Sequence, residues 1–142
     1  MSHFRSDAEI ERIARGLTDR SLPKPLWTHA AHFAAALWLL RIREADAMID
    51  MPPLIRAYNE ATGVLNTDAS GYHETITLAS LRAAHAWLTD RPGEPLHVVL
   101  DEMLATRMGR SDWLLKHWSK PVLLSPAARK AWIEPDLEPF PF

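Results

Sequence analysis

The sequence predicts an all-α fold, a compact bundle of about five to seven helices followed by a proline-rich extended tail. Apolar residues recur at helical spacing in several segments, and no segment alternates apolar and polar residues over the length of a strand. Helix-capping residues precede several of these segments. A chain of 142 residues fits one domain, which we expect to span residues 1–142, with the tail over 134–142.

The first two helices are predicted from their N-terminal signals. Ser6 followed by Glu9 forms a capping-box pattern, and apolar residues at helical spacing come after it. Residues 21–27 contain two prolines two positions apart, so we expect an extended linker there. Thr28 then caps a second helix, which is almost wholly apolar and is therefore expected to lie at the centre of the bundle.

A third helical pattern runs from Ala45 to about Ala61, where Gly63 is the expected stop. Pro52 and Pro53 lie inside this pattern. Because a proline within a helix removes a hydrogen bond and clashes with the preceding turn, we expect two helical pieces here.

The second half of the chain also favours helices. A loop rich in turn-forming residues over 64–71 separates it from the first half. We expect helices over residues 72–89, 95–109, 112–118 and 126–132, and then the extended tail.

Composition excludes several function classes. The absence of cysteine excludes disulfides, thiolate metal sites and a cysteine nucleophile. A net charge of −2 without a basic block argues against a nucleic-acid partner. The most apolar stretch, residues 33–40, is far shorter than a membrane span, and the N-terminal residues do not resemble a secretory signal. We therefore expect a cytoplasmic protein with no membrane partner.

Three histidines are the candidate metal ligands. His29 and His32 are three residues apart in the second expected helix, so they lie on one face, and His73 opens the fourth. Three imidazoles and a water would suit zinc, and a nearby carboxylate would also suit iron or another divalent transition metal. Glu74 is the candidate catalytic base at such a site. The same histidines would equally suit a metal-free polar pocket or purely structural roles.

Four further residues are candidates for contact with a small-molecule ligand. Thr77 lies one helical turn after His73, so its hydroxyl is near that imidazole. Aromatic side chains close to the histidines in sequence would wall a pocket. The full set of candidate ligand-binding residues is Trp27, Phe33, Tyr72 and Thr77.

Two motifs resemble those of a family of small uncharacterised bacterial helical proteins. They are Trp-Thr-His-Ala-Ala-His at residues 27–32 and Gly-Tyr-His-Glu-Thr-Ile-Thr at residues 71–77. The segments 58–63 and 125–136 also look like that family, so the resemblance extends from about Leu26 onward. It implies a shared fold and a shared site at the three histidines. It implies no activity, because none is established for the family.

The sequence leaves three functions open. The first is a metal-binding protein or metal-dependent enzyme that acts on a small molecule at His29, His32 and His73. It requires the ring nitrogens to converge within roughly 5 Å, since one ion must bind all three at about 2.1 Å. The second is a metal-free, small-ligand-binding domain. The third is a non-enzymatic interaction module in which exposed tryptophans form the face of a homo-oligomer.

Overall fold

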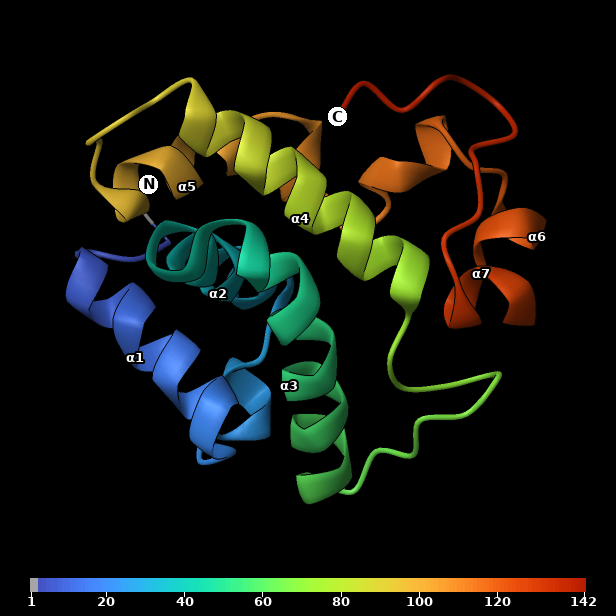
Figure 1. Ribbon diagram of the computed structural model, residues 1–142, viewed down its shortest axis with the longest axis horizontal. Coiled ribbons are helices and arrows are strands. Elements are labelled where there is room, and N and C mark those ends of the chain that lie inside the picture. Colours follow the sequence, from blue (N-terminus) through green and yellow to red (C-terminus); the bar gives the residue numbers. More distant parts are fainter. Residues whose placement is uncertain (1–2) are drawn as a thin grey trace.

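The computed structural model describes residues 3–142, and this part of the chain is all helical, as the sequence predicts (Figure 1). The α-helices are α1 (Asp7–Asp19), α2 (His29–Arg43), α3 (Ala47–Ala61), α4 (Glu74–Thr89), α5 (Leu96–Leu104), α6 (Lys120–Leu123) and α7 (Pro126–Lys130). Short 3-10 helices connect them: η1 (Lys24–Leu26), η2 (Glu44–Asp46), η3 (Arg107–Gly109) and η4 (Trp113–Lys116).

Helix α2 is the central element, which confirms the expectation from its apolar sequence. It packs against α1, α3, α4 and α5, and most of its side chains are buried. Its start is fixed by Thr28, whose Oγ1 accepts the Ala31 N–H at 3.2 Å. The first turn of α2, which carries His29 and His32, therefore has a defined position against the other helices.

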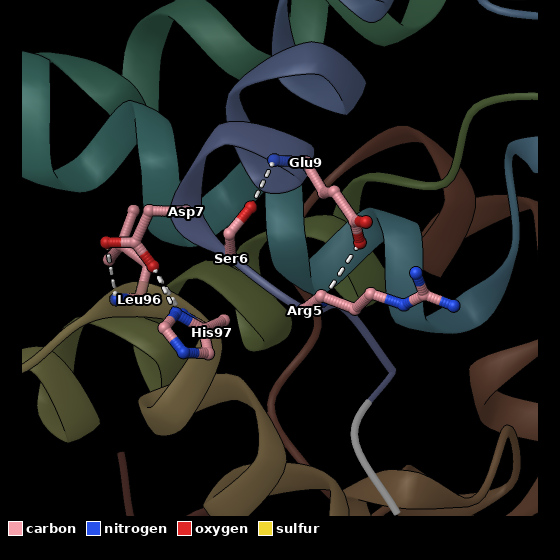
Figure 2. Close-up of polar contacts among 6 residues, drawn as sticks. All are labelled: Arg5, Ser6, Asp7, Glu9, Leu96 and His97. Carbon is pink, nitrogen blue, oxygen red and sulfur yellow. Dashed lines mark hydrogen bonds and ion pairs between the residues drawn. The ribbon is translucent and has the colours of Figure 1, made fainter.

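Helix α1 begins with half of the expected capping box (Figure 2). The Ser6 hydroxyl accepts the Glu9 N–H at 3.4 Å, as the pattern predicts. The Glu9 carboxylate, however, accepts the N–H of Arg5 at 2.9 Å, one residue before the one that a full box would use.

Helix α3 is continuous from Ala47 to Ala61, so the prediction of two pieces is wrong. Proline already has a φ angle suited to a helix, and each of the two prolines removes only one hydrogen bond. Pro52 is buried, together with its neighbour Met51 and with Ile55 one turn later. This packing keeps the turn around Pro52 and Pro53 helical.

The linker before α2 also differs from the prediction. Residues 24–26 form a 3-10 turn, where an extended chain was expected. Pro25 is compatible with this turn because it lies in its first residues, whose N–H groups need no partner within the turn.

The second half is more broken than the sequence predicts. Helix α4 begins at Glu74, with His73 as its N-cap, and α5 ends at Leu104. Residues 107–109 and 113–116 are 3-10 turns, and α6 was not expected. Helix α7 begins as predicted, since Ser125 caps it through the Ala128 N–H at 3.2 Å.

The tail over 134–142 lacks helix, as expected, and is mostly exposed, but it is held to the C-terminal turns by hydrogen bonds and by Phe140. The Leu137 N–H donates to the carbonyl of His117 at 2.9 Å, and Asp136 accepts the Ser119 N–H at 2.8 Å. In Figure 1 this red segment runs beside α6 and α7. Among the described residues, no helix combines the length and the apolar character that a membrane crossing requires.

Candidate functional site

A cavity of about 560 Å³ lies between the helical bundle and the C-terminal segments. This volume is within the range of small-molecule sites. Its lining comes from α2, α3, α4, η4 and α6, with two residues before η4 and one after α6. The apolar lining residues are Phe33, Ala36, Met51, Ile55, Ile76, Leu81, Trp113, Leu114, Leu115, Leu123 and Leu124. The polar ones are His29, His32, Thr77, Ser80, Ser111, Asp112 and Lys120.

His32 presents a hydrogen-bond acceptor to this cavity. Its Nδ1–H donates to the Thr28 carbonyl at 2.7 Å, and a carbonyl can only accept. The neutral ring therefore carries its proton on Nδ1 and has a lone pair on Nε2, for which the described residues offer no donor. The ring is also stacked on Trp27, with 3.8 Å between the ring centroids. Its orientation is thus fixed from two sides.

Burial lowers the pKa of His32 to about 4. The hydrogen bond to the Thr28 carbonyl acts in the opposite direction, and the proximity of His29 lowers the pKa further. Burial dominates, because the charged imidazolium loses more hydration than the neutral ring. At neutral pH, His32 is therefore an uncharged acceptor.

His29 has the opposite tautomer. Its Nε2–H donates to the Met108 carbonyl at 2.7 Å, so its lone pair is on Nδ1. The ring meets Phe33 edge-on, with the centroids 5.3 Å apart. His29 thereby connects the start of α2 to η3, and its ring is a second imidazole in the cavity lining.

His73 uses both of its ring nitrogens within the fold. Its Nε2–H donates to the Leu123 carbonyl at 2.7 Å, and its Nδ1 accepts the Ile76 N–H at 3.1 Å. The ring is buried, and burial lowers its pKa. His73 is absent from the cavity lining, although both of its partners belong to it. The residue caps α4 and joins it to α6.

The expected three-histidine metal site is therefore not assembled. Within residues 3–142, no three side chains among His, Asp and Glu are grouped so that they could hold one metal ion. The physical reason is that His73 has no lone pair left for a ligand bond, because its Nδ1 caps α4. In this geometry the three histidines are not grouped as one ligand set, and their role as metal ligands stays a prediction.

Glu74, the expected catalytic base, is engaged elsewhere. Its carboxylate accepts a hydrogen bond from the Tyr72 hydroxyl, with 2.5 Å between the two oxygens. Burial and this carboxylate together raise the pKa of Tyr72. Neither side chain lines the cavity.

The four expected ligand-binding residues fall into two groups. Phe33 and Thr77 line the cavity. Trp27 instead supports His32 by stacking on it, and Tyr72 is buried away from the lining. Their roles in ligand binding stay predictions.

Sequence reasoning missed the wall formed by the C-terminal segments. Ser119, Lys120 and Pro121 form a recognisable helix start, since proline suits the first turn of a helix. That signal would have predicted α6. It would not have placed Lys120 against the same cavity as His32, because this placement depends on long-range packing.

No family model, curated protein or solved structure matches this chain in the comparisons made. The resemblance of its two histidine motifs to a bacterial family therefore stays a prediction.

Proposed function

We propose that this protein binds a small, largely apolar molecule in the cavity and holds it through a hydrogen bond to the neutral imidazole of His32. The observation that carries the proposal is the Nε2 lone pair of His32 beside a mostly apolar cavity of about 560 Å³. Apolar walls supply affinity, and a few placed polar groups supply orientation. The favoured ligand has a hydroxyl or N–H group that donates to His32.

The state of the polar side chains supports binding over acid–base catalysis. A pKa of about 4 makes His32 a weak base at neutral pH. Ser80, a hydroxyl in the lining, donates to the Ile76 carbonyl at 2.8 Å and makes no hydrogen bond to a histidine among the described residues. These are properties of a recognition site, in which the protein groups keep their protons.

The test is a fluorescence titration with N-phenyl-naphthylamine, a neutral apolar probe that carries one N–H group. We expect the protein to bind it, and the variant His32→Leu to bind it about fivefold to tenfold more weakly, since one hydrogen bond is lost. Ser80→Phe places a ring in the cavity and should abolish binding. His85→Leu is the matched control, because His85 is exposed and lies outside the lining.

Two results would contradict the proposal. One is the absence of probe binding by the folded protein. The other is binding that Ser80→Phe leaves unchanged, which would place the probe elsewhere. Circular dichroism and thermal melting of each variant show that a lost signal reflects the cavity and not unfolding.

A further inference from the structure

The charges along the cavity define the ligand more narrowly than its shape does. Four titratable side chains line it: His29, His32, Asp112 and Lys120. With its pKa at about 4, His32 contributes no charge at neutral pH. Asp112 and Lys120 are the carboxylate and the ammonium that a charged ligand would meet in this lining.

The carboxylate of Asp112 is already neutralised within the protein. Arg110 donates to both of its oxygens, from Nε at 3.0 Å and from a terminal nitrogen at 3.1 Å. This two-point pair also lowers the pKa of Asp112. An anionic ligand in the cavity thus meets a compensated carboxylate and not a free negative charge.

Lys120 differs from the other lysines of the C-terminal segments. Lys116 lies 3.7 Å from a carboxylate oxygen of Glu138, and Lys130 lies 3.1 Å from one of Asp68. The Lys120 ammonium has no carboxylate and no hydrogen-bond acceptor among residues 3–142. Asp136, which approaches the same turn, accepts the backbone N–H of Ser119 instead.

We infer that the ligand is an organic acid, with an apolar body in the cavity and its anionic group at the ammonium of Lys120. This inference rests on the proposed function, because it assigns the charge of the molecule that the cavity holds. Lys120 is an exposed residue, so the apolar body supplies most of the affinity and the ion pair with the ammonium adds a smaller, solvent-screened part. The acceptor nitrogen of His32 on α2 and the ammonium of Lys120 on α6 together favour an acid that also carries a hydroxyl or N–H group.

The test compares two probes of nearly the same shape. Anilinonaphthalene sulfonate has the aromatic rings and the N–H of N-phenyl-naphthylamine and adds one anionic group. Both are titrated against the wild type, Lys120→Gln and the matched control Lys130→Gln. We expect Lys120→Gln to weaken binding of the sulfonate about threefold to fivefold, as for an exposed ion pair, and to change binding of the neutral probe less than about twofold. Lys130→Gln should change neither affinity.

The outcomes separate this inference from the proposed function. If Lys120→Gln leaves sulfonate binding unchanged, or weakens both probes equally, the assignment of an acid is wrong. The proposed function still holds in that case, provided that the neutral probe binds and Ser80→Phe prevents it. If neither probe binds the wild type, the proposed function itself fails. Melting curves of both lysine variants confirm that each is folded.

Discussion

At the residue scale, the second ring nitrogen of each histidine decides what that histidine can do. His29, His32 and His73 each donate one ring N–H to a backbone carbonyl, which sets the tautomer. In His73 the remaining nitrogen accepts a helix N–H, so the residue is structural. In His29 and His32 the remaining nitrogen has no donor among the described residues, and both rings line the cavity. Sequence spacing finds all three residues but cannot show this difference.

The pKa of His32 leads to a prediction about stability. Its folded value of about 4 lies below 6.5, the value of an unperturbed histidine. Between these values the unfolded chain binds a proton that the folded chain excludes, so stability is full above pH 6.5 and falls toward pH 4. At about pH 5, His32 should account for a loss of about 2 kcal/mol relative to neutral pH.

Urea unfolding at neutral pH and at about pH 5 measures this loss. The variant His32→Asn should show a smaller difference between the two conditions than the wild type. His85→Asn, at an exposed position, should keep the full difference. His73 has a pKa lowered in the same sense and is present in every protein compared, so it contributes equally. An unchanged difference in His32→Asn would contradict the prediction.

At the element scale, three helix caps that come from a serine or threonine beside their own helix were predicted, and the cap of α5, which comes from a distant residue, was not. Ser6, Thr28 and Ser125 each accept an N–H from their own helix, and all three were predicted. Helix α5 has Pro95 at its N-cap position, which offers no side-chain oxygen. Its cap comes from Asp7, far away in the sequence, so no local pattern indicates it.

Removal of Asp7 should therefore destabilise α5 from a distance. Its carboxylate accepts hydrogen bonds from the backbone N–H groups of Leu96 and His97, at 3.0 and 2.9 Å. It also lies 2.7 Å from the ring nitrogen Nδ1 of His97 (Figure 2). We expect Asp7→Ala to lower the free energy of unfolding by about 1–2 kcal/mol. Chemical denaturation measures the change. Asp19→Ala is the control, since the hydrogen bonds of the Asp19 carboxylate within residues 3–142 go to nearby Ser21, and an equal loss in both variants would refute the capping role.

The continuity of α3 gives a second prediction at this scale. Pro53 is exposed within the helix and lacks the N–H that would bond to the Ile49 carbonyl. Pro53→Ala restores that donor and should raise the free energy of unfolding by about 1 kcal/mol. Pro126→Ala, in the first turn of α7, restores no helical hydrogen bond and should stabilise nothing. Thermal melting of the two variants measures both effects. A lower melting temperature for Pro53→Ala than for the wild type would mean that α3 depends on this proline.

At the scale of the whole molecule, the cavity exists because the C-terminal segments fold back against the bundle. Residues 111–124 supply one part of its lining, and α2, α3 and α4 supply the other. The sequence indicates helices, caps and the histidine pair, because these depend on neighbours in the chain. It does not indicate which short turn meets which helix, because buried contacts between distant residues decide that. The all-α class was therefore predictable, and the assembly of the cavity was not.

Phe140 in the tail is the residue through which this assembly can be tested. Its ring lies between 5.2 and 6.2 Å, centroid to centroid, from those of Trp113, Trp118 and Trp132. Trp113 in turn packs on Phe33, and both line the cavity. Phe140→Ala should lower the free energy of unfolding by about 2 kcal/mol, because a half-buried aromatic side chain loses its contacts.

The same substitution should weaken binding of N-phenyl-naphthylamine, although Phe140 does not line the cavity. Trp113 loses one of the two aromatic rings that it contacts, so the cavity wall is held less firmly and part of the binding free energy must be used to order it. Phe142→Ala is the matched control, because among the described residues the Phe142 ring makes one aromatic contact, edge-to-face with Phe140 at 5.5 Å between centroids. Titration of both variants, under conditions where melting shows them folded, separates the roles. If Phe140→Ala lowers stability but leaves the affinity equal to that of Phe142→Ala, the tail stabilises the fold without shaping the site.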